Sequence, residues 1–192
     1  MRKIKNMNRI TLSILLCTLY SCQLFSAAAA GEKEKIDKNE INESLFAACC
    51  VAHVAKVKIA LDGEADVNYK SQGSNGLHAL LSSSLHVWSD SGKRFVRYAD
   101  HKQQWGDFLA EPTRMITQML IDKNIDVNAI DTLGRTALHY AAWGDQTDVV
   151  FLLLKAGADS TLKDTSKSTA EQVARELGYH DTANLIVDFN TI

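Results

Sequence analysis

The stretch GRTALHYAAWGDQTDVVFLLLKAGAD, residues 134–159, contains two short apolar runs on either side of a polar turn. Thr136 can cap a helix in which the apolar side chains recur at helical spacing. The Gly-Asp pair at 144–145 interrupts this pattern, and a second apolar run begins after Asp148. Gly157 then supplies the left-handed conformation that commonly ends a helix. The stretch therefore predicts a pair of short helices joined by a tight turn.

Two helices of this size need neighbours of their own kind, because neither is stable alone in water and the pair leaves an apolar flank uncovered. Asp126 and Asp159 lie 33 residues apart, and the sequence after Asp159 repeats the pattern in a more polar form. Upstream, Asp66 and Asp126 lie 60 residues apart, which exceeds the 33-residue period by 27. We therefore expect an insertion at residues 84–111.

This spacing predicts four repeat units that follow a charged lead-in. The second unit contains the insertion at 84–111, and the greater polarity of the fourth unit suits the end of a stack. The predicted boundaries are 31–40 for the lead-in, and 41–66, 67–126, 127–159 and 160–189 for the four units.

The third unit has features by which a known repeat family is identified. Its 33-residue period, the Gly-x-Thr-Ala-Leu-His-x-Ala-Ala run from Gly134, the Val-Val-x-Leu-Leu run from Val149 and the Gly-Ala-Asp run from Gly157 resemble an ankyrin repeat. The family usually has proline where Ala137 stands. The resemblance implies an all-α solenoid of stacked antiparallel helix pairs, with a concave face lined by the first helix of each unit. It also implies hairpin loops, here called fingers, near residues 69–74, 130–135 and 162–167.

Residues 1–30 have the layout of a secretory signal peptide. They carry four basic residues and no acidic one, followed by an apolar core at 10–19 and a run of small residues at 26–30. We expect cleavage between Ala28 and Ala30. The mature chain would then reach the periplasm of a bacterial cell or be secreted from it.

Two other interpretations of this leader stay open. Uncleaved, residues 10–30 are long enough to cross a bilayer, although six polar side chains make them a poor permanent anchor. Alternatively, Leu-Tyr-Ser-Cys at 19–22 resembles the lipobox of a bacterial lipoprotein, with Cys22 as the lipid acceptor.

The mature chain is acidic and lacks a disulfide framework. Removal of the leader leaves 17 basic residues against 23 acidic ones, a net charge of 17 − 23 = −6, which argues against nucleic acid as a partner. Cys49 and Cys50 are the cysteines that remain, and neighbours on a helix point about 100° apart, which disfavours a bond between them. Stability must therefore come from packing.

Catalytic motifs are absent from the sequence, so we expect no catalytic residue, no cofactor and no metal site. No nucleophile elbow, HExxH motif, phosphate-binding loop or clustered Cys/His spacing occurs. His78 and His139 occupy the Thr-x-Leu-His position of the repeat, where we expect the imidazole to bond groups of the neighbouring hairpin. His86 and His101 lie 15 residues apart in the insertion, a spacing that matches no compact ligand motif, so a weak metal site there is kept only as an alternative.

Partner contacts are expected at the variable surface positions of the third unit. Trp143 follows two small alanines and is predicted to face the groove, with Tyr140 one turn earlier. The competing interpretation is that Trp143 packs on the adjacent repeat or beneath the insertion. By the resemblance, the variable contact positions of this unit are Ile130, Thr132, Leu133, Arg135 and Trp143. Tyr140 joins them as a candidate because it lies one turn before Trp143.

The insertion is rich in aromatic side chains, and a loop of this length in a compact repeat is usually functional. Its Ser-Asp-Ser-Gly run at 89–92 predicts a turn, so the segment can fold as a hairpin or as a short helix. We expect it to serve both packing and recognition, and its candidate contacts are Trp88, Arg94, Arg97 and Trp105.

The expected function is that of an exported, non-enzymatic ankyrin-repeat scaffold. It would act as a monomer that binds another protein through its concave face, its fingers and the insertion. Two competing interpretations remain at this stage. The chain could be an accessory subunit of a periplasmic enzyme, or an enzyme or small-ligand protein whose site is built by the insertion.

Overall fold

The computed structural model describes residues 37–84, 86–89, 94–97 and 102–189. For residues 86–89, 94–97 and 102–109 it describes the backbone alone. The predicted leader, its cleavage site and Cys22 lie outside the described residues, as do residues 31–36 of the lead-in.

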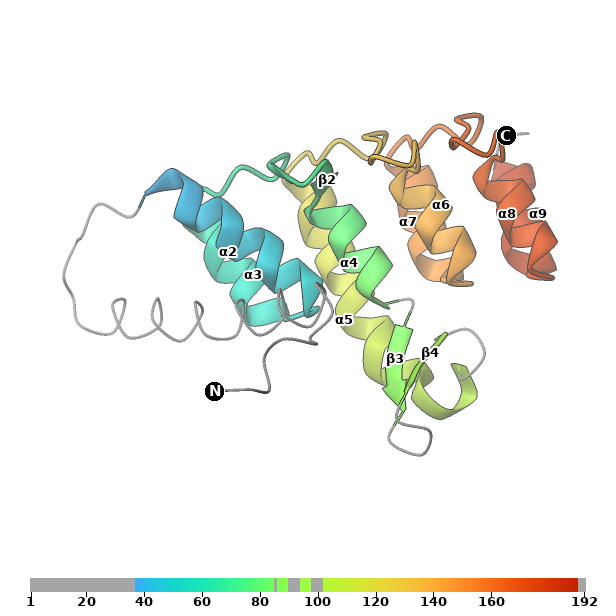
Figure 1. The fold of residues 1–192 in the computed structure, drawn as a ribbon, viewed down its shortest axis with the longest axis horizontal. Helices are drawn as coiled ribbons and strands as arrows, with labels where there is room; N and C mark the ends of the chain where they lie inside the picture. The colour runs from blue at the N-terminus through green and yellow to red at the C-terminus, as the bar shows by residue number, and fades with distance from the viewer. Residues whose placement is uncertain (1–36, 85, 90–93, 98–101, 190–192) are drawn as a thin grey trace, which may run out of the picture.

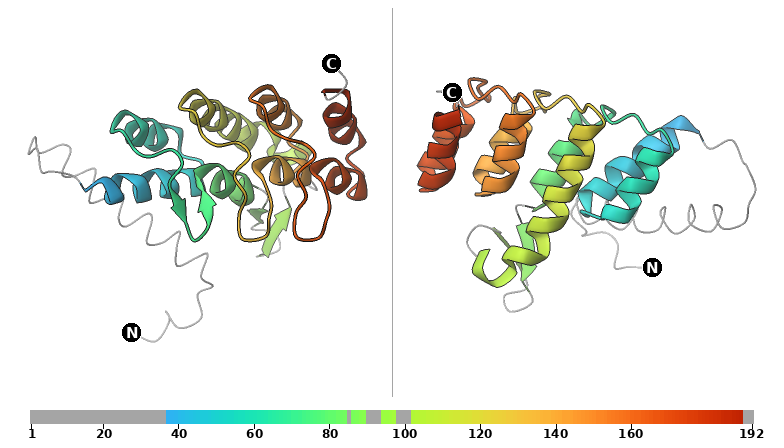
Figure 2. Two further views of the ribbon diagram at one scale, coloured as in Figure 1. Left: turned by 90° about the horizontal axis from the view of Figure 1, so that it is seen from above. Right: turned by 180° about the vertical axis from the view of Figure 1, so that it is seen from behind.

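The described helices form four pairs that stand side by side in one row (Figure 1). The first helix of each pair lies in one layer and the second helix in another, and the loops before α4, α6 and α8 project to the same side (Figure 2). The pairs are α2 (Lys38–Cys50) with α3 (Val54–Asp62), α4 (Gly76–Ser84) with α5 (Lys102–Asp122), α6 (Ala137–Trp143) with α7 (Thr147–Lys155), and α8 (Ala170–Glu176) with α9 (His180–Phe189). The predicted all-α solenoid is therefore confirmed.

The third unit shows why short helices suffice for this fold. Leu138 and Ala141 on α6 pack with Val150 and Leu153 on α7, and all four side chains are at most 1% exposed. The small alanine lets the helices approach closely, and the larger side chains fill the space between them. Gly157 ends the unit at φ +89°, a left-handed conformation that favours glycine.

The insertion folds partly as a hairpin and partly as helix. Strands β3 (His86–Ser89) and β4 (Arg94–Arg97) pair antiparallel, with Trp88 opposite Phe95. Residues 102–111, which the sequence pattern assigns to the insertion, are continuous with the second helix of the unit and make α5 21 residues long. Pro112 lies inside this helix, where it lacks the N–H that would bond back to the preceding turn.

A smaller hairpin forms the first finger. Strands β1 (Lys70–Ser71) and β2 (Ser74–Asn75) pair antiparallel just before α4. Gly73 between them has φ +85°, and a Cβ there would lie 2.7 Å from Cγ2 of Thr132 in the next finger. Only glycine fits this position without displacing the neighbouring finger.

Asparagine side chains join the loops of successive units. The backbone N–H of Asp126 donates to Oδ1 of Asn68 at 2.7 Å, and the N–H of Asp159 donates to Oδ1 of Asn128 at 2.8 Å. The same asparagine and aspartate positions therefore repeat because each pair ties one loop to the next.

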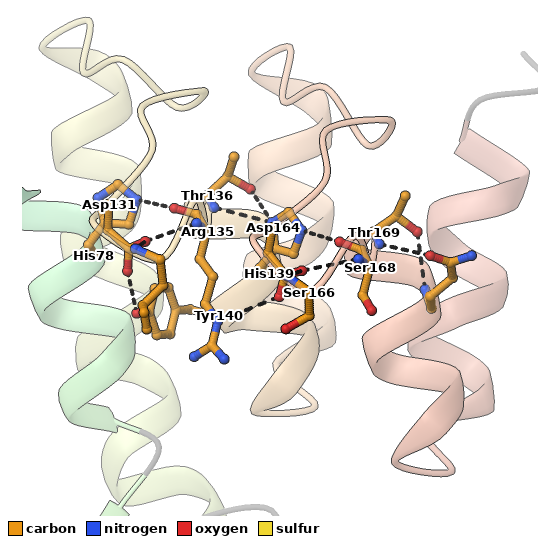
Figure 3. Close-up of polar contacts among 12 residues, drawn as sticks. His78, Asp131, Arg135, Thr136, His139, Tyr140, Asp164, Ser166, Ser168 and Thr169 are labelled. Carbon is orange, nitrogen blue, oxygen red and sulfur yellow. Dashed lines mark hydrogen bonds and ion pairs between the residues drawn. The ribbon is translucent and has the colours of Figure 1, made fainter.

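Two buried histidines join the first helix of one unit to the finger of the next, as predicted (Figure 3). Nε2 of His78 donates to the carbonyl of Arg135 at 3.0 Å, and Nε2 of His139 donates to the carbonyl of Ser168 at 3.1 Å. A carbonyl can only accept, so Nε2 carries the proton in both rings. Burial lowers the pKa of both histidines, and this outweighs the opposing effect of the carbonyl acceptors.

His139 also helps to start its own helix. Its Nδ1 accepts from the N–H of Thr136 at 3.2 Å and lies 2.9 Å from the Thr136 hydroxyl. In the fourth unit a glutamine caps its helix in the same way, because Oε1 of Gln172 accepts from the N–H of Thr169 at 3.0 Å. His139 differs from Gln172 because, besides capping its own helix, it also bonds the Ser168 carbonyl of the next unit.

Within the described ranges, no helix has both the length and the apolar character needed to cross a bilayer.

The buried side chain of Leu153 tests the helix packing. Leu153 is fully buried, so Leu153→Ala should lower the free energy of unfolding by about 2–5 kcal/mol in urea titrations. Leu152→Ala makes the same truncation at a partly exposed site on the same helix and should cost clearly less. Equal losses for the two variants would contradict the phase that the structure gives to α7.

His139→Gln tests the histidine bond between units. Glutamine can keep the cap, as Gln172 does, but the bond to Ser168 is lost, so we expect a destabilisation of about 1 kcal/mol at pH 7. The folded pKa lies below the ordinary value of 6.5, so the unfolded chain takes up a proton more readily. Neutral His139 therefore contributes its full stability above pH 6.5, the ordinary pKa. This contribution is lost as the pH falls from 6.5 through the lower pKa of the folded state.

The difference between wild type and His139→Gln in urea titrations should therefore shrink from pH 7 to pH 5. A difference that stays constant or grows would contradict the proposed protonation state. His180→Gln, at an exposed histidine on α9, serves as the control and should change stability at pH 7 by no more than about 0.5 kcal/mol.

Candidate functional site

Arg135 lies at the centre of the candidate site. Its guanidinium carbon lies 4.9 Å from the ring centroid of Trp143 and 5.8 Å from that of Tyr140, so the cation interacts with both aromatic rings. Its Nε lies 3.8 Å from Oδ2 of Asp164 in the third finger, and the Arg135 side chain keeps 27% of its surface exposed. The residue thus joins the second finger, α6 and the third finger while leaving part of its charge open to solvent.

Asp131 shapes the second finger from within. Its Oδ1 accepts from the N–H groups of Leu133 at 2.8 Å and Arg135 at 2.9 Å, and its Oδ2 accepts from the Tyr140 hydroxyl at 2.6 Å (Figure 3). Partial burial raises the pKa of Asp131, but these hydrogen bonds more than offset that effect and hold the pKa below its usual value. The carboxylate is therefore ionised at neutral pH and used internally.

The Tyr140 hydroxyl is the donor in this contact with Asp131. Burial and its bond to Asp131 raise the pKa of Tyr140 to about 12, so the phenol stays protonated and acts as a donor. Its side chain is 8% exposed, and its ring meets that of His78 edge to face with centroids 6.1 Å apart. The predicted contact residue Tyr140 is thus buried in this structure, where it holds the finger against α6.

Asp164 repeats this arrangement in the third finger. Its Oδ1 accepts from the N–H of Ser166 at 2.8 Å and from that of Ser168 at 3.0 Å. The fingers also touch directly, because the N–H of Thr165 donates to the carbonyl of Leu133 at 3.0 Å. The second and third fingers therefore form one hydrogen-bonded surface.

The other predicted residues of the third unit differ in exposure. Ile130 is 52% exposed and Leu133 is 46% exposed, and Thr132 between them is exposed as well. Trp143 is partly exposed, and the rest of its side chain packs against the core. Arg135 contacts Trp143 directly, and Ile130, Thr132 and Leu133 lie in the same finger as Arg135.

The insertion residues occupy separate elements. Trp88 lies on β3, Arg94 and Arg97 lie at the two ends of β4, and Trp105 lies in the first turns of α5. Their side chains are outside the described part of the structure. The hairpin leaves α4 at the end opposite to the fingers (Figure 1), and Trp143 ends α6 next to α4.

Sequence reasoning missed the two aspartates that organise the fingers. Asp131 and Asp164 lie one 33-residue period apart, each three residues before a left-handed backbone position, Gly134 at φ +68° and Lys167 at φ +66°. An aspartate recurring in phase with a turn signals a carboxylate that bonds the backbone of that turn. The pattern was present in the sequence and identifies a structural role.

The described residues contain no group of three or more histidine, cysteine, aspartate or glutamate side chains placed to hold a metal ion. His101 lies outside the described residues, and for His86 only the backbone position on β3 is described.

Comparison with known proteins gives the same fold. A family model described as ankyrin repeats in three copies matches residues 112–164. A fowlpox virus (strain NVSL) protein named as an ankyrin repeat protein is 28% identical over 158 residues, which cover 77% of this chain and 24% of that protein. Neurogenic locus notch homolog protein 1 of Homo sapiens is 42% identical over 50 residues, covering 26% of this chain and 2% of that protein.

A third relative, from Acanthamoeba polyphaga mimivirus and also named as an ankyrin repeat protein, is 33% identical over 61 residues, which cover 32% of this chain and 8% of that protein. The chain thus spans about a quarter or less of the length of these relatives. The similarity lies in the repeat sequences, and the relatives are viral and animal proteins. The chain contains ankyrin repeats and folds as an all-α ankyrin-repeat solenoid.

Proposed function

We propose that this chain is a scaffold that binds another protein through its finger face. We define the finger face as the three fingers, residues 69–74, 130–135 and 162–167, together with the first helices α2, α4, α6 and α8. The observation that carries the proposal is the contact between Arg135 and Trp143, both partly exposed, in the unit whose finger also exposes Leu133. Tryptophan and arginine in partly buried, rigid positions are the residues that most often dominate protein interfaces.

The rigidity of this pair supports the proposal. Arg135 is held by Asp131 through its backbone and by Asp164 through its side chain, while Trp143 is held by the core. A partner would meet side chains that already occupy their bound positions, so little side-chain entropy would be lost on binding.

The polar groups around the site support a role without catalysis. His78 and His139 bond to backbone carbonyls, and Asp131 and Asp164 bond to backbone N–H groups of their own turns. A general acid or base must be free to exchange a proton with a substrate, and these four described groups are engaged in holding the fold. We therefore propose that the chain acts by binding, as a monomer and without a cofactor.

The insertion would add a second contact. The β3–β4 hairpin follows α4 directly, and the adjacent α6 ends at Trp143, so a partner on the finger face could reach both elements. We propose that Trp88, Arg94, Arg97 and Trp105 contribute from this side.

Capture of a partner with the mature chain tests the proposed function. Trp143→Ala should weaken binding of the captured partner by about 30-fold or more, as expected for a hot-spot tryptophan, with the helical circular dichroism retained. Leu133→Ser changes an exposed fingertip residue outside the core and should weaken the same partner.

Phe151→Ala is the matched control, because Phe151 is a 46% exposed aromatic residue on α7, in the other layer of helices. Binding that is unaffected by Trp143→Ala and Leu133→Ser, or weakened equally by Phe151→Ala, would rule out the finger face as the binding surface.

We also propose that the chain is exported. The support is the basic, apolar and small-residue order of residues 1–30. The periplasm of a bacterial cell, or the medium outside it, is the compartment that this order suits.

Expression of the full chain in bacterial cells tests export. The protein in the periplasmic fraction or the medium should begin between residues 29 and 31 when its N-terminus is sequenced. A chain that begins at Cys22 with the added mass of a lipid would identify a lipoprotein, and Cys22→Ala should then abolish that mass. A chain that still begins at Met1 in the cytoplasm would contradict export.

A further inference from the structure

The exposed charged side chains of the three fingers are all positive. Lys70 in the first finger and Lys163 and Lys167 in the third are exposed. The two acidic residues of the fingers, Asp131 and Asp164, are partly or fully buried. This distribution differs from that of the chain as a whole, which has a net charge of −2.

The finger aspartates are turned inward by the contacts described above. Asp131 accepts three hydrogen bonds from its own finger and from α6. Asp164 accepts one from Ser166 of its own finger and one from Ser168 directly after it, and it also pairs with Arg135. Their negative charge therefore stabilises the turns, and the lysines remain as the charges that face solvent.

The two first helices at the centre of the finger face, α4 and α6, contain no acidic residue. Helix α4 has the sequence GLHALLSSS and α6 the sequence ALHYAAW. Their histidines are buried, and burial lowers the pKa of both. Asp131 and Asp164 are engaged in the contacts described above, so the partly exposed guanidinium of Arg135 is the cation at the centre of this face, between the lysines of the first and third fingers.

Exposed apolar side chains lie beside these cations. Ile130 and Leu133 are about half exposed on the second finger, and Trp143 offers part of its ring beneath Arg135. A ligand that matches both the cations and the exposed apolar side chains must carry negative charges and apolar groups along one chain. Because the cations are distributed over the row of fingers, it must also extend across that row.

We propose that the finger face recognises an extended acidic segment of the partner protein, in which carboxylates alternate with apolar side chains. A carboxylate would pair with Arg135, others would pair with the finger lysines, and the apolar side chains would pack on Leu133 and Trp143. This inference rests on the proposed protein-binding function and names the chemistry of the partner.

A protein segment suits these observations better than a long polyanion. The cations are few and separated by apolar side chains, whereas nucleic acid binding uses dense, continuous positive charge. The charge of the chain outside the fingers is negative overall and would repel a polyanion that extended beyond them.

The test uses three fluorescein-labelled peptides of equal length, which share the same apolar positions and carry Glu, Gln or Lys at the others. Binding to the mature chain is measured by fluorescence anisotropy at low and at physiological salt. The Glu peptide should bind most tightly, and its affinity should fall as salt rises.

The variant that separates finger charge from total charge is the triple substitution Lys70→Gln, Lys163→Gln and Lys167→Gln. It should weaken the Glu peptide about tenfold, as expected for three exposed ion pairs. The matched control is Lys58→Gln, Lys123→Gln and Lys155→Gln, which removes three exposed lysines that lie on, or directly after, the second helices α3, α5 and α7. It should change the affinity by less than about twofold.

Three results would overturn the inference. One is equal weakening by the two triple variants, which would indicate an effect of net charge. Another is binding of the Gln or Lys peptide as tight as that of the Glu peptide. The third is an absence of Glu-peptide binding, including the case where single-stranded DNA or phosphatidylserine vesicles bind through the finger lysines instead.

The experiments distinguish a failure of this inference from a failure of the proposed protein-binding function. If a captured partner depends on Trp143 while the Glu peptide fails to bind, protein binding at this face stands and the acidic class of partner is wrong. If no partner depends on Trp143 or Leu133, protein binding at this face is itself wrong, whatever the peptides do.

Discussion

The structure depends on the burial of short helices against their neighbours. Helices α6 and α8 contain seven residues each, far fewer than an isolated helix needs in water. Each is stable because the units beside it cover its apolar side chains, and because histidine and asparagine side chains bond the backbone of the next unit. Any change that separates two units therefore destabilises more than the residues at that junction.

The same constraint determines where recognition can occur. The two central first helices use most of their residues for packing, with seven of nine buried in α4 and six of seven in α6. Among the side chains that the structure describes, exposed positions remain at the fingertips and at the ends of these first helices. Arg135 is placed where these regions meet, with its backbone tied to the second finger and its side chain reaching the third finger and Trp143. A rigid stack thus presents a small set of side chains at fixed positions.

The fold was largely predictable because the third unit has a clear period. The helix pair, the cap at Thr136 and the bond from His139 to the next hairpin all follow from residues whose roles are local or repeat in phase. The extent of α5 was harder to predict, because Pro112 resembles a helix boundary and the first half of the helix has no counterpart in the other units. The sequence indicated a hairpin in the insertion only as one of two options, and strands β3 and β4 now identify it.

The candidate site was predictable in part. The positions of Leu133 and Arg135 follow from the repeat, but the environment of Tyr140 depends on Asp131, nine residues away in sequence, and the sequence pattern does not encode that contact. The orientation of Trp143 likewise depends on its packing against the core and on its contact with Arg135. The environments of side chains that are fixed by tertiary contacts are therefore not predictable from the repeat pattern alone.

Hydrogen–deuterium exchange of the mature chain, alone and with its captured partner, tests the central claim most directly. The account predicts slower exchange in residues 130–143 and in the neighbouring fingers when the partner is bound, with α3, α7 and α9 unchanged. Protection confined to those outer helices, with no change at residues 130–143, would contradict the finger face as the binding surface.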